Sequence, residues 1–498
     1  MYLNNKLLII VLLIYCFTIT ANAKDGKQLT LNSMVDIAIN NSYQTKRLEY
    51  DIKRSIHWLN AERAGLKTQI YMNLISPDLQ KISEHKWNSN LFRDEIVRQN
   101  TQHWQSDLAI KHPLILWGYP TNGSFSLNYT IYRYTQKDHI SQTDYYNRLY
   151  LKFEQPFFLP NEQKNDLEEA ELDLKDIKLE YIQERVEIIE DVSDDFYDLF
   201  RLTYNDQMYD RQIRYLIELK NIISGFQNDE SMELTSLEQV KLELANVQEK
   251  RSSNRSSLRQ RWVALKQRLR LKDPDSLYIE PNITINPVEV DLDQAISYGY
   301  NNDPYLQRLH IRKRRSELDV EDQKGNNAFH VTLEMTYGIE KGDPRFKGLW
   351  REFDNSNSAT LNAYIPIWDG GQRKERIQAE LIDLQSRQLD IEEEKSDKKN
   401  DIITAYTNLN EYYKRSESMR QSLQLAQQIT DINIDKFKNK QISLQDMLQI
   451  IARTQETEEN FIEIYLNYRR ALLDLLTETY YDYETNSSLY DEIDLEYD

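Results

Sequence analysis

The chain has 498 residues and a formal net charge of −19, with 81 acidic against 62 basic side chains. This acidic balance argues against nucleic-acid binding, because nucleic acids are bound through a basic surface. Only 12 glycines and 11 prolines are present, so we expect few turns and long, uninterrupted secondary-structure elements.

The first 23 residues have the pattern of a secretory signal peptide. Lys6 precedes an apolar core at residues 7–19, and Ala21-Asn22-Ala23 forms a small-residue cleavage site. Cys16, the only cysteine, lies within this core, where its neighbours fit a lipid-attachment site poorly. We therefore expect an exported mature protein without disulfides, thiolate metal sites or cysteine nucleophiles. No later stretch approaches the roughly 18 apolar residues of a membrane-spanning helix.

Two segments, residues 29–55 and 290–316, resemble each other in a single register. Each begins with a short predicted helix, continues through an Asn-Asn pair and ends in a longer, charged helix. This internal similarity predicts a duplicated fold. We expect a first structural repeat at residues 24–287 and a second at residues 288–478.

Each repeat is predicted to end in a pair of long helices. The first pair is expected at residues 161–226 and 237–271, and the second at residues 372–438 and 444–477. At 1.5 Å per residue the longer members reach roughly 100 Å. Helices of this length that are polar around most of their circumference must pack side by side, as a bundle or coiled coil.

Four predicted strands, at about residues 106–158 and 329–368, alternate between apolar and polar side chains. Such alternation is typical of half-buried sandwich strands and also of membrane-barrel strands, which turn their apolar side chains toward lipid. Four strands cannot close a barrel, so the barrel interpretation requires an oligomer. The side chains that would face lipid are Phe125, Leu127, Tyr129, Ile131, Leu149, Leu151, Phe153, Val331, Leu333, Met335, Leu361 and Ile365.

Prolines mark the predicted ends of three strands. Pro113, Pro156 and Pro366 each stand before an apolar residue, and proline belongs where sheet pairing stops because it lacks a backbone N–H. They suggest one common rim at which strands give way to helices. The first repeat also has an extra stretch, about residues 75–117, without a counterpart in the second. It contains "ISPDLQKISEHKWNSN", which is expected to form a loop or a short helix, and the strand-like "LAIKHPLIL".

The stretch "YIPIWDGGQRKERIQAE" is predicted to be a corner between a strand and a long helix. A phosphate-binding loop would need a longer glycine pattern within a βαβ unit, and neither surrounds it. In the corner interpretation Pro366 ends pairing, Trp368 lies at a membrane interface and Asp369 caps the helix. Gly370 and Gly371 supply the backbone freedom that the change of direction requires.

The sequence offers no catalytic, cofactor or metal site. Acidic pairs such as Asp194-Asp195 lie on long polar helices and are interpreted as solvated faces. The histidines lack metal-ligand spacing, and nucleotide-binding motifs are missing. From Glu478 onward the chain has eight acids and no lysine or arginine, so residues 479–498 are expected to form a solvated tail.

Together these features resemble the TolC-type outer-membrane efflux protein family, over essentially the whole mature chain. The specific matches are "LTLNSMVDIAINNS", the corner "YIPIWDGGQRKERIQAE", and the helical turn and following helix in "FKNKQISLQDMLQIIARTQETEENF". The resemblance implies a mainly α protein with a membrane β-barrel portion, assembled as a homotrimer. Each chain would give four strands to a twelve-stranded barrel in outer-membrane lipid, with its helices forming a tunnel in the periplasm.

The resemblance also implies a passive channel of a tripartite efflux or secretion system. An inner-membrane transporter of the RND, ABC or MFS type would supply the substrate, and a periplasmic adaptor would dock at the helical tips. In this family two aspartates ring the tip aperture; here Asp446 matches the first, but Gln449 replaces the second. Glu233 or Glu238 could compensate for it. The alternative is a structural coiled-coil scaffold of the cell envelope that transports nothing.

Overall fold

The computed structural model describes residues 28–88, 92–137, 141–225, 230–271, 277–325 and 328–489. The predicted signal peptide, Cys16 and residues 490–498 lie outside the described residues. The chain divides into two compact units, and both predicted repeats contribute to each. We call Met1–Arg47, Tyr181–Asp303 and Lys395–Asp498 the helical unit, and Leu48–Glu180 and Pro304–Glu394 the sheet unit.

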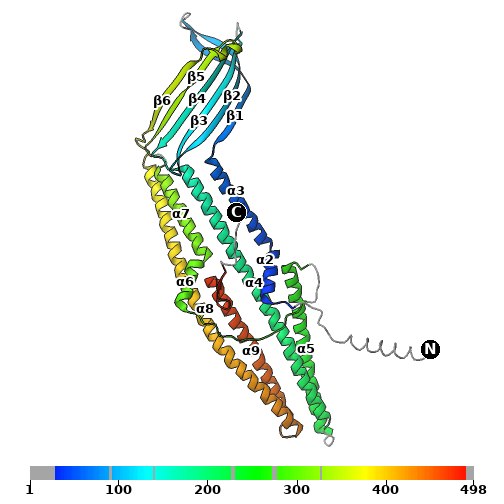
Figure 1. The fold of residues 1–498 in the computed structure, drawn as a ribbon. Coiled ribbons are helices and arrows are strands. Elements are labelled where there is room, and N and C mark those ends of the chain that lie inside the picture. The colour runs from blue at the N-terminus through cyan, green and yellow to red at the C-terminus, as the bar shows by residue number, and fades with distance from the viewer. Residues whose placement is uncertain are drawn as a thin grey trace, which may run out of the picture. The chain divides into compact units, whose positions relative to one another are not determined.

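Helices make up most of the described chain, as the sequence predicted (Figure 1). None of the helices in the described residues combines the length and apolarity needed to cross a membrane. The helices are α2 (Leu31–Asn41), α3 (Tyr43–Gly65), α4 (Glu162–Ser224), α5 (Glu230–Leu269), α6 (Leu292–Asn302), α7 (Pro304–Gly325), α8 (Gln372–Lys438) and α9 (Leu444–Thr479), with a 3₁₀ turn, η1 (Phe346–Trp350).

In the helical unit, the two long helix pairs pack against each other close to their turns. Leu216 and Leu219 of α4, Val240 of α5, Phe437 of α8 and Met447 of α9 belong to one buried apolar cluster. All four helices contribute to this cluster, so burial of its apolar side chains holds them together near the turns. Helices α4, α5 and α9 also share a second buried cluster, which includes Leu199, Leu265 and Ile462. The prediction that the long helices pack side by side is confirmed.

The sheet unit contains a six-stranded antiparallel sheet with the strand order β1-β2-β3-β4-β5-β6. Its strands are β1 (Gln69–Asn88), β2 (Arg93–Leu116), β3 (Tyr119–Lys137), β4 (Ser141–Phe157), β5 (His330–Asp343) and β6 (Asp354–Tyr364). Figure 1 shows them side by side, with α3, α4, α7 and α8 meeting one end of the sheet.

The prediction of four strands in the sheet was wrong, because the hairpin β1–β2 adds two more. The strand-like "LAIKHPLIL" does belong to β2, but the segment expected to be a loop or a short helix is part of β1. Polar residues interrupt the apolar alternation in "ISPDLQKISEHKWNSN", so this segment has no clear strand period of its own. Its pairing is set instead by β2, where Ile75 lies opposite Gln105 and Leu79 opposite Gln102. Tertiary pairing here overrides a weak local signal.

Two further boundaries differ from the prediction. Helix α5 starts at Glu230 rather than at residue 237, because the intervening residues are mostly good helix formers without glycine or proline. The expected solvated tail is folded as far as Leu489, through the short strands β7 (Tyr481–Asp482) and β8 (Ser487–Ser488). Leu489 is buried in a cluster with Ile182 of α4, which anchors this hairpin to the helical unit.

Candidate functional site

The register of the sheet separates its side chains into two faces. Phe125 lies opposite Phe153, Phe153 opposite Met335, and Met335 opposite Ala359. Because directly paired residues share a face and successive residues alternate, the whole register follows from these pairs. One face, here called the apolar face, contains Phe125, Leu127, Tyr129, Ile131, Leu149, Leu151, Phe153, Val331, Leu333, Met335 and Leu361, as well as residues of β1 and β2.

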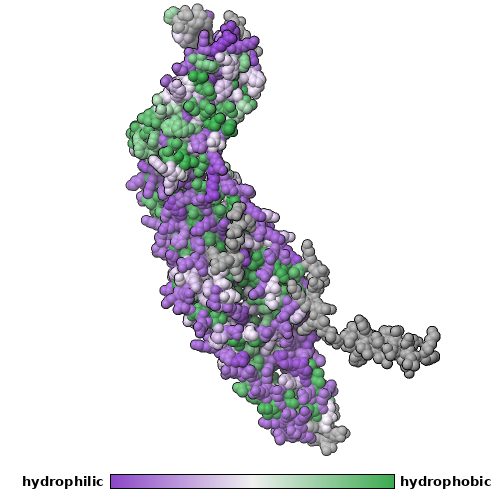
Figure 2. All heavy atoms as spheres, viewed as in Figure 1, coloured by the Kyte–Doolittle hydropathy of each residue, from purple (hydrophilic) through white to green (hydrophobic). Residues whose placement is uncertain are grey.

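The apolar face collects the residues predicted to meet lipid, except Ile365, which lies beyond the end of β6. Leu361 is 67% exposed and Leu151 is 55% exposed, so neither side chain enters a core formed by the described residues. Hydrophobic side chains gather over the strands in Figure 2, whereas the helices are mainly hydrophilic. From Val331 to Ile339 the apolar residues of β5 span about 27 Å of strand, comparable with the roughly 25 Å apolar band of membrane barrels.

The part of the apolar face that belongs to β1 was not predicted from the sequence. Ile70, Met72 and Leu74 are more than half exposed, and the first two continue the apolar rows of β2 without a register shift. The signal was present in the sequence, because these residues alternate with Tyr71 and Asn73. The run is only a few residues long before Ser-Pro-Asp interrupts it, which is too short to identify a strand by period alone.

The opposite face of the sheet is polar and is cross-linked by charges. The Nζ atom of Lys152 lies 2.9 Å from Glu154 and 3.2 Å from Glu334. The Tyr146 hydroxyl donates to Glu340 at 2.6 Å, and the Thr130 hydroxyl donates to Asp107 at 2.7 Å. A sheet with one apolar and one ion-paired face is suited to separate lipid from water.

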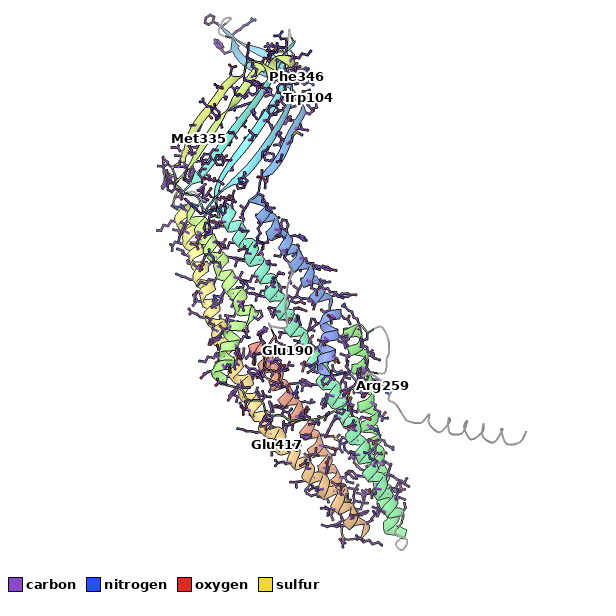
Figure 3. The ribbon with its side chains drawn as sticks, viewed as in Figure 1. Trp104, Glu190, Arg259, Met335, Phe346 and Glu417 are labelled. Carbon is purple, nitrogen blue, oxygen red and sulfur yellow. The ribbon has the colours of Figure 1, made fainter. Side chains whose placement is uncertain are left out.

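Aromatic side chains lie near both ends of the sheet. Trp104 and Phe346 line one hollow at the end away from the helices, while Met335 lies nearer the helices (Figure 3). At the helix end Trp117 is 94% exposed and Trp368 is 87% exposed. Aromatic belts of this kind are typical of the two interfaces of a bilayer. Of these residues, only Trp368 was predicted from the sequence.

The corner between β6 and α8 depends on backbone geometry. The carboxylate of Asp369 accepts hydrogen bonds from the backbone N–H groups of Gly371 and Arg373, each at 2.9 Å, and so caps α8. These bonds, that to Arg373 foremost, hold the pKa of Asp369 below its usual value. Gly370 and Gly371 have φ angles of 70° and 91°. A Cβ on either would meet no atom within 4 Å, so their conformation, and not space, requires glycine.

The prolines lie where pairing stops or becomes irregular. Pro156 is opposite Thr332 at the end of the β4–β5 ladder, and Pro366 lies two residues beyond the end of β6. Pro113 lies at a register shift between β2 and β3. In the antiparallel sheet all three are at the end that meets the helices, as the predicted common rim requires.

The residues predicted to ring the tip aperture are only partly brought together. Asp446 is exposed and forms a capping box with Ser443, whose hydroxyl donates to the Asp446 carboxylate at 2.6 Å. Gln449 is exposed one turn further along α9. Glu238 of α5 accepts from Lys241 of its own helix at 2.8 Å, and the side chain of Glu233 lies outside the described residues.

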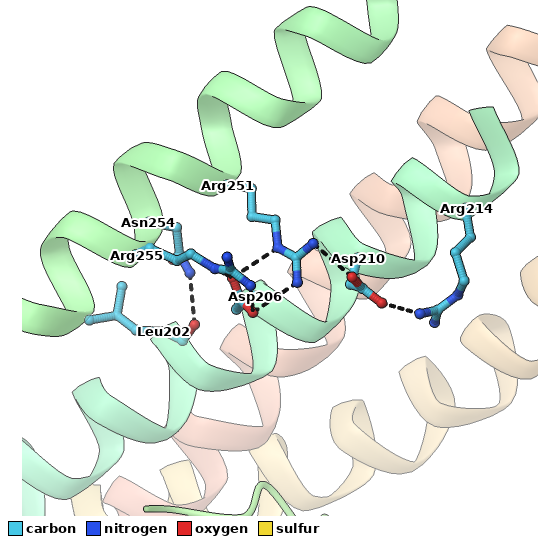
Figure 4. A network of polar contacts seen from close by, with 7 residues as sticks. All are labelled: Leu202, Asp206, Asp210, Arg214, Arg251, Asn254 and Arg255. Carbon is cyan, nitrogen blue, oxygen red and sulfur yellow. Dashed lines mark hydrogen bonds and ion pairs between the residues drawn. The ribbon is translucent and has the colours of Figure 1, made fainter. Parts of the chain in front are cut away.

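Partly buried ionic contacts join α4 to α5 in the helical unit, and they were not predicted from the sequence. Asp206 of α4 accepts from Arg251 and Arg255 of α5, while Arg251 also reaches Asp210 at 2.7 Å (Figure 4). Burial alone would raise the pKa of Asp206, but the bonds from the two arginines outweigh it and lower that pKa. Within the described residues, no group of three or more His, Cys, Asp or Glu side chains is arranged to hold a metal.

No protein-family model matches the chain, and no curated protein matches its sequence. Solved structures do match it over most of its length. The outer membrane protein VceC from Vibrio cholerae has a TM-score of 0.61 at 14% identity, covering 90% of this chain and 95% of VceC. The Campylobacter jejuni CmeC outer membrane channel has a TM-score of 0.62 at 14% identity, covering 94% and 90%. The open Neisseria gonorrhoeae MtrE outer membrane channel has a TM-score of 0.62 at 11% identity, covering 90% and 88%.

The chain has the TolC-type outer-membrane factor fold. Because the identities are this low, the similarity is one of fold. It confirms the predicted fold class of long helices combined with an antiparallel sheet. Within this TolC-type fold the strand number stands out, because the resemblance implied four strands and the described sheet has six.

Proposed function

We propose that this protein is a passive channel of the outer membrane, assembled as a homotrimer. The two-faced sheet carries the proposal: its apolar face is exposed in the single chain, and its polar face is held by ion pairs such as Lys152 with Glu334. A sheet of this kind gains stability when lipid covers one face and water wets the other. The similarity to the CmeC and MtrE outer membrane channels supports the same conclusion.

The helical unit would form the periplasmic part of the conduit and would gate it at the turns α4–α5 and α8–α9. The many polar side chains of these helices support a water-filled bore. The buried cluster that joins Leu219 to Met447 holds the two turns of one chain together, so that they would move as a unit. Adaptor docking would supply the energy to separate the helices. An inner-membrane transporter of the RND, ABC or MFS type would deliver the substrate.

Two measurements on the full-length protein test this proposal. Outer-membrane fractions should contain a heat-modifiable trimer on denaturing gels, and the purified trimer should conduct ions in planar lipid bilayers. Recovery of the protein as a soluble periplasmic monomer would contradict the proposal. A trimer that never conducts, even after treatments that splay the tips, would favour the envelope scaffold instead.

A further inference from the structure

The sheet has two open edges. Within the described sheet, β1 is hydrogen-bonded only to β2, and β6 only to β5. Every second backbone N–H and C=O pair of an edge strand points away from the sheet. In the hydrocarbon of a bilayer each such unpaired group costs several kcal/mol, so membrane strands occur only in closed ladders. Six strands cannot close alone, since the smallest membrane barrels have about eight.

The hairpin β1–β2 belongs to the same two-faced sheet as the other strands. Gln69 to Ile75 pairs with Gln105 to Lys111 without a shift, and the register shift follows only after Ile75. Ile70 and Met72 therefore lie on the apolar face, in the same rows as Leu127 and Tyr129. A hairpin that plugged the lumen or lay on the cell surface would be in contact with water. It would not need apolar side chains aligned with those of the neighbouring strands.

We infer that β1 of one copy pairs with β6 of the next copy, so that every chain gives six strands to the barrel. This inference rests on the proposed homotrimeric channel, and three six-stranded sheets then make an eighteen-stranded barrel in place of twelve strands. Barrel diameter grows roughly linearly with strand number, so the lumen would be about half as wide again. The extra hairpin is thus the feature that sets the bore within the membrane.

Strand direction excludes the other edge pairings. β1 leads away from α3 at the helix end of the sheet, while β6 leads toward α8 at that end, so the two run antiparallel. Pairing β1 with a second β1 would either invert one copy in the membrane or turn its apolar face to the opposite side. Only the β1–β6 contact is head-to-tail, and a head-to-tail contact can close a ring.

The faces also restrict the register of the contact to steps of two residues. Ile70, Met72 and Leu74 form the apolar row of β1, and Ala363, Leu361 and Ala359 form that of β6, in each case counted from the helix end. Among the registers that keep both rows on the apolar face, we choose the one that aligns the rows from the helix end. It places Met72 beside Leu361 and a large side chain beside an alanine on either side of them. The bulge of β1 after Ile75, with Pro77 in it, then ends the contact.

Disulfide cross-linking tests the contact directly, because Cys16 is the only cysteine and lies in the predicted signal peptide. Met72→Cys is combined with Leu361→Cys in full-length protein, oxidised in outer-membrane fractions and run on non-reducing gels. Directly opposed strand residues are within the Cα separation that a disulfide allows. We expect covalent dimers and trimers, with nothing larger than a trimer. Met72→Cys with Asn362→Cys, whose side chain is on the polar face, should remain monomeric.

A competing pair decides between eighteen and twelve strands. A twelve-stranded barrel would leave β1–β2 aside and join β3 to β6 of the next copy, so that Leu127→Cys would cross-link with Leu361→Cys. That result overturns the inference, as does a failure of Met72→Cys to cross-link with cysteine at Leu361, Ala359 or Ala363. The trimer and the conductance of the reduced variants are measured in parallel. If both persist while the Met72 variants fail, the β1–β6 contact is wrong and the channel stands.

Discussion

Arg211 of α4 donates a hydrogen bond to the Glu458 carboxylate of α9, with Nη2 2.5 Å from Oε1. The two partners differ in exposure, because the Glu458 side chain is 6% exposed and that of Arg211 is 31% exposed. Gln427 of α8 donates to the same oxygen at 3.4 Å. These two hydrogen bonds join α4, α8 and α9 at a point further from the turns than the buried cluster of Leu219 and Met447.

The unequal burial predicts unequal effects of mutation. Arg211→Met leaves a buried carboxylate without its cation, and such losses cost about 3–5 kcal/mol. In Glu458→Gln the arginine still reaches water and the new amide oxygen still accepts a hydrogen bond. We therefore expect a loss of stability of about 1 kcal/mol. Unfolding of the detergent-solubilised protein measures both, with Arg214→Met, an exposed pair partner on α4, as a nearly neutral control. Equal effects of the first two variants would contradict this explanation.

At the α8–α9 turn, charge and helix capping can be separated. Ser443→Ala removes the cap of α9 but keeps the acid at Asp446, and should cost about 1 kcal/mol. Asp446→Asn keeps an acceptor for Ser443 but removes the charge, so we expect a smaller loss of stability and less divalent-cation block in planar bilayers. If divalent-cation block decreases in Ser443→Ala but is unchanged in Asp446→Asn, Asp446 acts through helix structure and does not line the aperture.

At the corner, substitution of glycine should cost conformational energy alone. Gly370→Ala or Gly371→Ala forces an L side chain into the left-handed region, at about 1–2 kcal/mol each. Gly65→Ala at the end of α3 is the matched control, because its surroundings are equally open and its φ is not positive. Thermal unfolding should show a lower midpoint for the corner variants and no decrease of the midpoint for the control. A drop of the same size for Gly65→Ala would refute the conformational argument.

Neighbouring positions of β6 test which face meets lipid. Leu361→Arg places a charge on the apolar face, which costs about 2–4 kcal/mol near the bilayer midplane. Thr360→Arg places the same charge on the polar face, opposite Glu334, and should be tolerated. Folding into lipid vesicles, followed by heat-modifiable migration, compares the two. The assignment fails if Thr360→Arg is the more damaging change.

Lys398 of α8 should matter most at neutral pH. Its Nζ lies 2.6 Å from Asp303, which is 1% exposed, and 2.8 Å from Glu478. Burial lowers the pKa of Lys398, but the carboxylates of Asp303 and Glu478 outweigh it and raise that pKa. Its stabilisation is therefore fully present below the unfolded pKa of about 10.4 and is lost as the pH rises through the higher folded pKa.

Removing that lysine leaves a buried carboxylate, so Lys398→Met should lose about 3–5 kcal/mol at pH 8. Adding Asp303→Asn should recover part of the loss, because the amide carries no charge. Unfolding midpoints at pH 8 and pH 11 provide the readout. A difference between wild type and Lys398→Met that does not shrink at the higher pH would contradict the ionic explanation.

Sequence patterns predicted the elements whose signal is long and local. The bounds of α8 agree with the prediction, and α9 extends only two residues further, because each helix runs for many turns between recognisable breaks. The strands β3 to β6 were identified by a period of two. The corner at Asp369 was recognised because a Gly-Gly pair is rare in a chain with so few glycines.

The features that were missed depend on partners distant in the chain. Strand β1 has a short apolar run and is held by β2, and the tail hairpin is anchored by Leu489 against α4. Arg211 and Glu458 are 247 positions apart. One local signal did exist, because Glu458 occupies an apolar position of α9 between Ile451 and Phe461, where an acid requires a partner.

The two corners of the fold differ in how they would tolerate random mutation. The corner before α8 needs glycine at two consecutive positions, and almost any change there introduces strain. The corner before α4 is spread over amide side chains: Asn161 donates to the carbonyl of Pro120 and accepts from Lys164, and Asn122 donates to the carbonyl of Pro160. Loss of one such bond leaves the others in place. The corner before α8 is therefore the more fragile of the two. In mutational scans, substitutions at its two glycines should be poorly tolerated, whereas single substitutions at the corner before α4 should have smaller effects.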